Sequence, residues 1–333
     1  MTRVLIVGGY GLVGGWVARH LAKARPELEL VVGGRNPAAA AALAAETGAE
    51  VARVDTADAA ASLGDVGHTD LVISAVTDPN DDLLRAALRC GAAHIGIVRT
   101  ADTLGPTAMA AAILAQRPAL VLGHWQAGAI TYAALAAANG LSRVDRIELA
   151  GLYHLADPAG LMAQSASGGF FTQALLRRDG EWVHVPPAEN GRTVTRTGQP
   201  PFAAQPMSAL DVPGLAAVTG SRWLRFDLGV GDSAGTAAGG PASHEVYADV
   251  WGEDRNQQPC GRRTIISDPQ GQAHLTALGV LIGAERVLGL DGAAPPPSGL
   301  VFPETAIDPQ QAIARLRDFG VRVESEDAPA AAA

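Results

Sequence analysis

The sequence predicts an α/β fold: a doubly wound parallel sheet in the N-terminal third, followed by a second α+β domain built on an antiparallel sheet. Up to residue 122, short apolar segments rich in β-branched residues alternate with longer helical patterns. This alternation is typical of a parallel sheet whose strands are joined by right-handed helical crossovers. Beyond residue 123, several segments alternate polar and apolar residues, as half-buried antiparallel strands do.

The helices expected in the first domain have recognisable stop signals. Pro26 follows the first helix, and Gly48 and Gly91 follow two later ones. Proline cannot continue a helix, and glycine readily takes the left-handed conformation at a helix end. The expected strands are 4–7, 28–32, 50–54, 70–76, 94–98 and 119–122, and the expected helices are 15–24, 38–47, 58–64, 80–90 and 103–116.

The elements expected beyond residue 123 are more irregular. Helices are expected at 127–139, 165–178, 271–288 and 309–319, and strands at 147–153, 181–185, 223–229, 244–251 and 262–267. A turn at 252–254 pairs the last two strands as a hairpin, and the Pro-, Gly-, Thr- and Gln-rich segment 186–220 is expected to form loops. The expected domains are 1–122 and 123–269, with a disordered alanine-rich tail at 326–333.

The first fourteen residues carry the strongest functional signal. An apolar strand, 4–7, runs directly into Gly9, Gly11 and Gly14, which have the G-x-G-x-x-G spacing of a dinucleotide-binding turn. The first glycine allows a tight turn, the second lets the backbone approach a pyrophosphate, and the third lets the helix pack close to the strand. The helix that follows offers free N–H groups to the phosphates. The motif therefore predicts a Rossmann-type nucleotide site.

The end of the second strand indicates which nucleotide binds. NAD-specific units carry an acidic residue there, which accepts a hydrogen bond from the ribose 2′-OH. This chain has Gly33, Gly34, Arg35 and Asn36 instead. Arg35 is placed to pair with a 2′-phosphate, which favours NADP over NAD; the alternative is a solvated loop arginine. Asp55, after the third strand, is expected either to accept a hydrogen bond from the adenine amine or to cap the following helix.

Composition excludes several other classes. The net charge is −9 and there is no basic run, which argues against a nucleic-acid surface. No apolar segment approaches a membrane span of about 20 residues. The glycines at positions 8 and 9 interrupt the only candidate for a signal peptide. Cys90 and Cys260 have no CxxC spacing, so we expect a reduced, cytoplasmic protein without a disulfide framework.

Several motifs together resemble the saccharopine reductase-like family. They are residues 7–14, the Gly34-Arg35-Asn36-Pro37 signal, 70–76, 90–94, 299–304 and 319–321. The resemblance covers residues 1–140 and 270–325, and it implies that 270–325 return to the dinucleotide-binding domain. Members of the family include saccharopine and carboxynorspermidine dehydrogenases, which reduce an imine formed between an amine and a carbonyl compound, or run the reverse oxidation.

This chain departs from the family pattern in two places. The family often has Gly-x-x-Pro-Gly after the sixth strand, whereas this chain has Ala127 in place of the proline. Some saccharopine-type enzymes are thought to use a catalytic lysine, but Lys23, on the first helix, is the only lysine here. A catalytic or Schiff-base lysine is therefore excluded.

The ligand of an open α/β sheet lies beyond the carboxyl ends of its strands. This rule selects the glycine turn and the segments 75–77, 98–100 and 123–128. The expected cofactor-binding residues are Gly9, Tyr10, Gly11, Leu12, Val13, Gly14, Gly34, Arg35, Asn36, Asp55, Ala75, Val76, Thr77 and Val98.

The candidates for catalysis are His124, Tyr153 and Arg99. His124 titrates near neutrality and is a candidate proton donor, with a packed or capping histidine as the alternative. Tyr153, with the adjacent His154, ends the first strand of the second domain; the alternative is ordinary sheet packing. Arg99 could hold a substrate carboxylate with both guanidinium nitrogens, and the alternative is a salt bridge.

Other site chemistries fit less well. Trp125 is expected to pack as a wall. Ser165, Ser167, Gly168 and Gly169 form a polar helix entry that could bind an anion or simply cap the helix. The other histidines are scattered without metal-ligand spacing, so no metal is expected.

These observations lead to one principal prediction and two alternatives. The principal one is an NADP-dependent oxidoreductase that carries hydride to or from an imine, amine or carbonyl centre of a small molecule in a cleft between the domains. The alternatives are a non-catalytic NADP-binding sensor or assembly subunit, and an enoyl reductase acting on a lipid or polyketide, which the apolar pairs Phe170-Phe171 and Leu175-Leu176 would allow. A homodimer is expected because antiparallel sheets with one polar face often pair across a two-fold axis.

Overall fold

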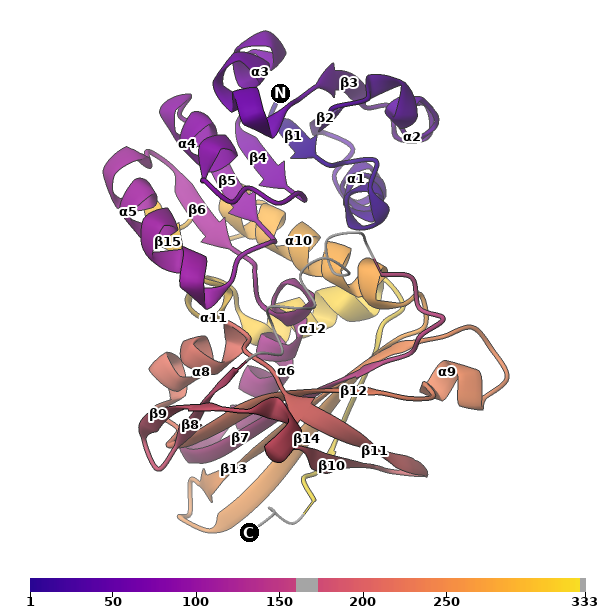
Figure 1. Cartoon of the computed structure of the whole chain (residues 1–333), viewed down its shortest axis with the longest axis vertical. Coiled ribbons are helices and arrows are strands. Elements are labelled where there is room, and N and C mark those ends of the chain that lie inside the picture. The colour runs from indigo at the N-terminus through magenta and orange to yellow at the C-terminus, as the bar shows by residue number, and fades with distance from the viewer. Residues whose placement is uncertain (160–172, 330–333) are drawn as a thin grey trace. The chain divides into compact units, whose positions relative to one another are not determined.

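The structure, a computed structural model, describes residues 1–159 and 173–329 and contains two compact units (Figure 1). The first unit comprises Met1–Ala127 and Thr276–Ile307, and the second comprises Gly128–Leu275 and Asp308–Ala333. Each unit is therefore assembled from two segments that are far apart in the sequence.

A parallel sheet of seven strands forms the centre of the first unit, in the order β15-β6-β5-β4-β1-β2-β3. The strands are β1 (Arg3–Val7), β2 (Glu29–Gly34), β3 (Glu50–Arg53), β4 (Leu71–Ser74), β5 (Ala93–Gly96), β6 (Pro118–Val121) and β15 (Gly299–Val301). The chain order reverses at β1, which lies between β2 and β4. In open α/β sheets this reversal marks the place where ligands bind.

Helices cover both faces of this sheet (Figure 1). They are α1 (Leu12–Ala24), α2 (Ala41–Thr47), α3 (Ala59–Val66), α4 (Asp82–Arg89), α5 (Leu104–Leu114), α10 (Gln272–Leu288) and α11 (Pro303–Ala306). On one face, Arg25 after α1 pairs with Glu285 of α10 at 2.9 Å. Gly283 of α10 approaches the side chain of Leu120 on β6.

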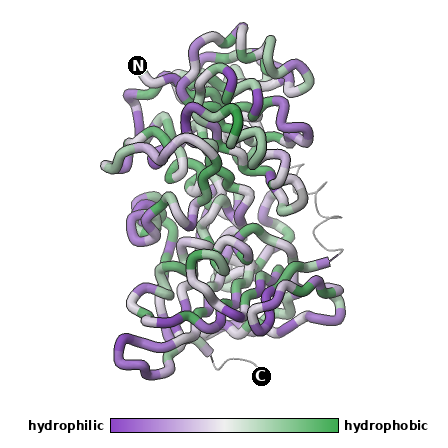
Figure 2. Tube along the Cα trace, turned by 90° about the vertical axis from the view of Figure 1, so that its left-hand side faces the viewer, coloured by the Kyte–Doolittle hydropathy of each residue, from purple (hydrophilic) through white to green (hydrophobic). Residues whose placement is uncertain are grey.

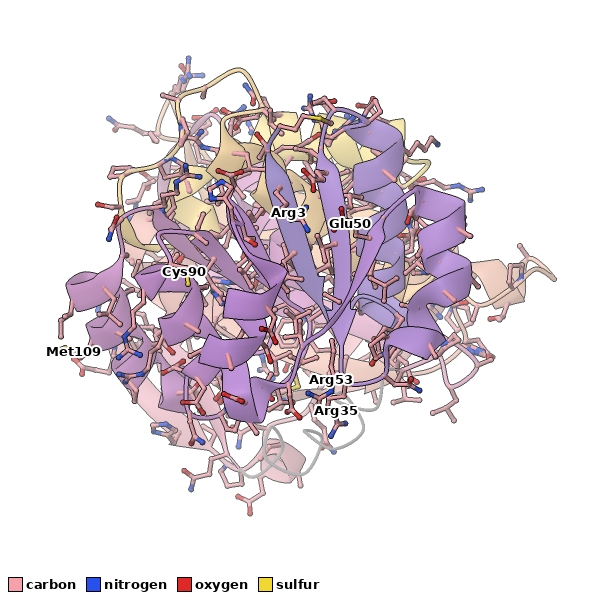
Figure 3. All side chains as sticks on the ribbon, turned by 90° about the horizontal axis from the view of Figure 1, so that it is seen from above. Arg3, Arg35, Glu50, Arg53, Cys90 and Met109 are labelled. Atoms are coloured by element: carbon pink, nitrogen blue, oxygen red, sulfur yellow. The ribbon has the colours of Figure 1, made fainter. Side chains whose placement is uncertain are left out.

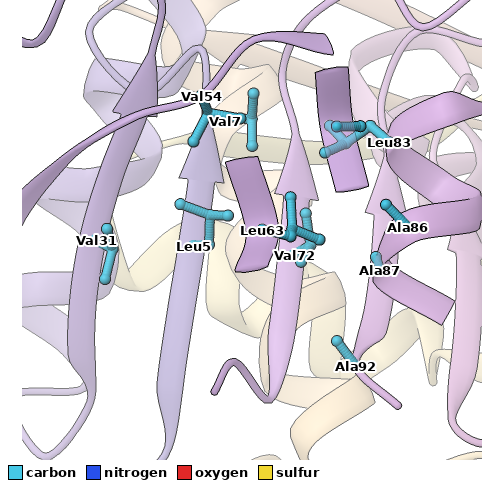
Figure 4. Close-up of a cluster of buried hydrophobic side chains, with 11 residues drawn as sticks. Leu5, Val7, Val31, Val54, Leu63, Val72, Leu83, Ala86, Ala87 and Ala92 are labelled. Atoms are coloured by element: carbon cyan, nitrogen blue, oxygen red, sulfur yellow. The ribbon is translucent and has the colours of Figure 1, made fainter. Parts of the chain in front are cut away.

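The opposite face is built on an apolar cluster between the strands and helices α3 and α4 (Figure 4). Leu5, Val31 and Val72 supply it from three strands, and Leu63 and Leu83 from the two helices. The apolar, β-branched strand residues expected to be buried are therefore the ones that hold these helices in place. Along the described part of the trace, many of the hydrophilic residues lie at outer turns (Figure 2).

The second unit is built on a mixed sheet in the order β10-β11-β12-β7-β13-β14-β16, with β8 pairing β12 and β9. The strands are β7 (Leu141–Tyr153), β8 (Ala174–Arg178), β9 (Glu181–Val185), β10 (Arg192–Arg196), β11 (Gln199–Pro206), β12 (Trp223–Val230), β13 (His244–Asp254), β14 (Pro259–Asp268) and β16 (Arg322–Asp327). The helices are α6 (Ala129–Ala138), α8 (Asp211–Thr219), α9 (Ala234–Ala237) and α12 (Pro309–Asp318). α6 packs on β7, β13 and β14, and α8 and α12 pack against α6.

The second sheet differs from the expected antiparallel sheet because β7 and β12 run parallel. The expected helix 165–178 is wrong over its last five residues, which form β8; residues 165–172 lie outside the described part. Asp179 and Gly180 both have positive φ, of 50° and 90°, so they form a tight turn that pairs β8 with β9.

Three further expectations are corrected by the structure. The segment 186–220 is not loop throughout but contains β10, β11 and α8. The expected turn at 252–254 is the end of β13, and the reversal comes after Asp254, where Gln257 has a φ of 62°. β16 reaches Asp327, two residues into the expected tail, because it pairs along the edge of β14.

The C-terminal segment is also divided differently from the expected 270–325. Residues 276–307 belong to the first unit, whereas α12 and β16 belong to the second. The reason is local: α12 packs against α6, and β16 extends the second sheet. None of the helices described is long and apolar enough to span a membrane.

Candidate functional site

The glycine turn between β1 and α1 is a tight backbone cradle. Gly8 has a φ of 79°, a conformation that favours glycine, so Gly8 and not Gly9 makes the turn. The Gly8 amide donates to the Gly33 carbonyl at 2.8 Å, and the Gly11 amide donates to the Gly8 carbonyl at 2.9 Å. These bonds fix the turn against the end of β2.

Gly14 has no room for a side chain. A Cβ there would lie 2.8 Å from the Gly9 Cα and 2.9 Å from the Gly8 carbonyl carbon. α1 begins at Leu12, and no side chain in the described residues caps it at Gly11. The first-turn amides, which include those of Leu12, Val13 and Gly14, have no acceptor within the helix. This backbone fits the pyrophosphate of a dinucleotide, because it combines donors with the positive end of the helix dipole.

The segment after β4 lies directly beside this turn. The Ala75 amide donates to the Val7 carbonyl at 2.9 Å, and a Cβ on Gly8 would meet the Val76 side chain at 2.6 Å. Thr77 is exposed next to them, and Val98, after β5, is half-buried. The structure thus brings Ala75 and Val76 together with the glycine turn, as expected for neighbouring strands of a parallel sheet.

The end of β2 presents a cation. Gly33 and Gly34 are buried, whereas Arg35 and Asn36 are exposed. Figure 3 shows Arg35 at this edge of the sheet. The Asn36 amide donates to the Tyr10 hydroxyl at 3.0 Å. Tyr10 therefore reaches from the glycine turn to the segment that carries Arg35.

Asp55 acts as a helix cap in the structure. Its Oδ1 accepts from the Ala57 amide at 3.2 Å, and its Oδ2 lies 3.6 Å from a nitrogen of Arg53. Of the two expectations for Asp55, these contacts favour the cap over the adenine acceptor.

The guanidinium group of Arg99 is paired with other groups of the protein. Its guanidinium donates to the Asp78 carbonyl at 2.8 Å and pairs with the Asp81 carboxylate at 2.7 Å, and these three side chains are buried. Asp78 also accepts from the amides of Leu83 and Leu84 in the first turn of α4. Arg99 therefore ties the segment after β5 to the start of α4, which favours the salt-bridge alternative over a substrate clamp.

His124, after β6, forms a buried pair with Glu304. Its Nε2 lies 3.1 Å from the Glu304 Oε2, and the two side chains are 1% and 6% exposed. The backbone that follows is strained, because Gln126 and Ala127 have φ values of 51° and 50°. Thr276 of α10 donates to the Gln126 side chain, and a Cβ on Gly279 would overlap the Ala127 carbonyl oxygen. Close packing of α10 therefore holds this loop in its strained conformation.

Tyr153 and His154 are both held by the turn that follows β7. The Tyr153 hydroxyl donates to the Asp157 carbonyl at 2.9 Å, and burial raises the pKa of Tyr153 above its ordinary value. His154 accepts from the Ala156 amide at 3.0 Å through Nδ1, and its Nε2 lies 3.6 Å from Asp232.

Asp157, in this turn, belongs to a group of buried acids and histidines that the sequence analysis did not predict. His274 Nδ1 lies 2.7 Å from an Asp268 carboxylate oxygen. His244 Nδ1 lies 3.9 Å from the Asp157 carboxylate, which accepts from the Gln272 amide at the start of α10. Burial raises the pKa of Asp157 to about 6, with Asp268 adding to the effect, and burial lowers the pKa of His244 to about 3.

The sequence contains one signal for this group: Asp157 and Asp268 each precede a proline at or just after the end of a strand. His244 and His274 have no His-x-x-x-His spacing, so the sequence does not indicate that they lie near these two acids. Among the residues the structure describes, no three His, Cys, Asp or Glu side chains come together in a way that could hold a metal ion. Ser165, Ser167, Gly168 and Gly169 lie outside the described residues.

The N-terminal part of the chain is similar to a known protein family. Residues 4–145 match the family model of the saccharopine dehydrogenase NADP binding domain. A search of the curated proteins gave no match.

Among solved structures, apo saccharopine dehydrogenase (L-Glu forming) from Saccharomyces cerevisiae matches with a TM-score of 0.73 at 12% identity, covering 99% of this chain and 100% of that one. A putative myo-inositol dehydrogenase from Sinorhizobium meliloti 1021 matches with a TM-score of 0.54 at 13% identity, covering 95% and 94%. At these identities the likeness concerns the fold, which is that of an NAD(P)-binding dehydrogenase.

Proposed function

We propose that this chain, whose residues 4–145 match the family model of the saccharopine dehydrogenase NADP binding domain, is an NADP-dependent oxidoreductase. It would transfer hydride to or from an imine, amine or carbonyl centre of a small molecule. The observation that carries the NADP preference is the end of β2, where the acidic residue of NAD-specific units is absent and Arg35 is exposed.

The backbone around the glycine turn supports dinucleotide binding. Gly8 and Gly14 let β1, α1 and the segment after β4 pack closely together, with Ala75 and Val76 at the neighbouring edge, so the turn brings the first amides of α1 to the strand ends. Because helix N-termini stabilise anions, the phosphates would be held mainly by backbone amides. Arg35 would add a charge-assisted contact to a 2′-phosphate.

His124 is our first choice for the group that donates or accepts the proton during reduction. NADPH, when bound, supplies the hydride, so the protein has only to handle the proton and hold the substrate. The Nε2 of His124 lies 3.1 Å from the Glu304 carboxylate, which is close enough to exchange a proton with the ring. Tyr153 is the second choice, and no lysine is available for this role because Lys23 lies on α1.

The test is a titration of the purified protein with NADPH and NADH, followed through nucleotide fluorescence, and then a turnover assay on imines and ketones. We expect NADPH to bind at least tenfold more tightly than NADH, and at least one imine to be reduced. Equal affinities would contradict the role of Arg35, and no binding of either nucleotide would reject the proposed function.

One observation favours a second candidate, a non-catalytic NADP-binding protein. Arg99, His124 and Tyr153, the three residues expected to carry catalysis, each contact other groups of the protein. Tight NADPH binding with no turnover across the whole panel would support this candidate. The enoyl reductase alternative stays a prediction: Leu176 is buried in β8, and Phe170 and Phe171 lie outside the described residues.

A further inference from the structure

The side-chain position of Gly34, at the end of β2, is filled by Tyr10. A Cβ built on Gly34 would lie 2.5 Å from the Tyr10 hydroxyl oxygen and 2.6 Å from Cζ of the same ring. Real Cβ atoms are essentially never closer than 3.0 Å to another heavy atom of this kind. While Tyr10 keeps this position, residue 34 has to remain glycine.

Tyr10 is fixed there from both sides. Its backbone belongs to the glycine turn, between Gly9 and Gly11, and its hydroxyl accepts the Asn36 amide at 3.0 Å. The ring is half-buried. Because NAD-specific units place their acidic residue at the end of the second strand, Tyr10 occupies the space that such a side chain would need.

A second guanidinium group lies at the same edge of the sheet. Arg53 is the last residue of β3 and pairs in register with Gly34 of β2. Its side chain is 67% exposed, and the nearest acid is Asp55 at 3.6 Å. Arg35 follows Gly34 directly and is also exposed, and the two arginines lie together at one end of the neighbouring strands (Figure 3). In a chain of net charge −9, this pair forms a local cationic edge.

We propose that Tyr10 and Arg53 determine the choice between NADP and NAD. Tyr10 excludes an acidic residue from position 34, and Arg53 joins Arg35 in binding the 2′-phosphate. This inference rests on the proposed function, since it concerns the same nucleotide. It adds that the preference depends on a residue of the glycine turn and on a residue of β3, in addition to Arg35.

The role of Arg53 is tested by titrating the Arg53→Ala variant with NADPH and NADH. We expect NADPH to bind about tenfold more weakly, as for loss of one charge-assisted contact, and NADH to bind within twofold of the wild-type protein. The matched control is Arg89→Ala, an exposed arginine at the end of α4, which should change neither affinity. Equal losses for the two nucleotides, or no loss for NADPH, would overturn the role of Arg53.

The role of Tyr10 is tested with Gly34→Asp alone and combined with Tyr10→Ala. Gly34→Asp alone should lower the melting temperature and weaken the binding of both nucleotides, because the new side chain would clash with the Tyr10 ring. Adding Tyr10→Ala should restore the melting temperature and reverse the preference, so that NADH binds more tightly than NADPH. If Gly34→Asp alone already prefers NADH without loss of stability, Tyr10 does not exclude the acid.

Tyr10→Phe separates the effect of the ring from the effect of the hydroxyl. It keeps the ring over Gly34, so Gly34→Asp should remain destabilising in the Tyr10→Phe background. Failure of the two hypotheses is distinguishable. Wild-type protein that binds neither nucleotide rejects the proposed function, whereas wild-type protein that prefers NADPH but is indifferent to these substitutions rejects only the present inference.

Discussion

At the scale of single residues, the glycine pattern contains most of the information about the nucleotide site. The spacing alone indicates a turn and a closely packed helix, and Gly14 occupies such a close approach. The spacing does not reveal that Gly8 carries the positive φ or that Tyr10 covers Gly34. These features depend on side-chain direction, which a pattern of small residues does not specify.

Gly14→Ala should impair both folding and nucleotide binding. The added methyl group would lie against the carbonyl group of Gly8, so α1 would have to move away from β1. We expect a loss of about 1–3 kcal/mol in the free energy of unfolding, as for other overpacked sites, and at least tenfold weaker NADPH binding in a fluorescence titration.

The matched control is Gly64→Ala in α3, where nothing lies within 4 Å of the new Cβ. That substitution should be neutral or stabilising by up to about 1 kcal/mol, since alanine favours the helix. Similar behaviour of the two variants would mean that Gly14 is not in close contact.

Asp157 should give the protein a measurable pH dependence. Burial raises its pKa from 3.8 to about 6, so the folded state holds this proton more tightly than the unfolded state does. The resulting stabilisation is complete below pH 3.8 and is lost as the pH rises through about 6. As the pH rises from 4 to 7, the free energy of unfolding of Asp157→Asn should therefore rise relative to that of the wild-type protein, by on the order of 1–3 kcal/mol. Chemical denaturation of both proteins at these two pH values measures the difference, and a constant difference would contradict the raised pKa.

At the scale of elements, the parallel sheet follows closely from the sequence, whereas much of the second sheet does not. β1, β2, β4, β5 and β6 are mostly buried runs, and their local pattern locates them within a few residues. β3 is mostly exposed, and the half-buried β15 was not expected. The leucines and arginines of Ala174–Arg178 favour a helix, yet this segment forms β8. The Asp179-Gly180 turn and the pairing with β9 decide its conformation. The parallel pairing of β7 with β12 joins segments that are far apart in the sequence, so no local pattern predicts it.

Arg99 joins the segment after β5 to the start of α4, but from the sequence alone the same arginine could equally bind a substrate. We expect Arg99→Met to lower the free energy of unfolding by about 3–5 kcal/mol, because Asp78 and Asp81 would remain buried without their cation. Arg117→Met removes an arginine that is 46% exposed and paired with Asp70, and should cost less than about 1 kcal/mol. Urea denaturation measures both. A stable Arg99→Met protein that binds NADPH but has lost turnover would instead return Arg99 to the substrate site.

At the scale of the whole molecule, each unit combines distant parts of the chain, which explains the limits of sequence reasoning about the site. His124 was expected beside the nucleotide, but its partner Glu304 comes from 180 residues further on. Asp157, His244, Asp268 and His274 are likewise gathered by the second sheet and the first turn of α10. Local spacing predicts turns and helix ends; it does not predict which distant side chains will meet.

Nucleotide binding should stabilise the protein as a whole. A ligand at one hundred times its dissociation constant adds about 2.7 kcal/mol to the free energy of unfolding. We expect calorimetry to show a higher melting temperature, by several degrees, with NADPH than with no nucleotide, and a smaller increase with an equal concentration of NADH. An increase that is the same for both would contradict the preference attributed to Arg35.

The late position of β15 and β16 in the sequence has a consequence for synthesis on the ribosome. A nascent chain that has reached residue 290 still lacks the outer strand of the parallel sheet, and one that has reached residue 320 still lacks the strand that covers β14. Each sheet therefore has an unpaired strand edge until its late strand, β15 or β16, has been synthesised. Such edges are where incomplete chains associate with one another, so this protein should depend on chaperones more during its production than after its release.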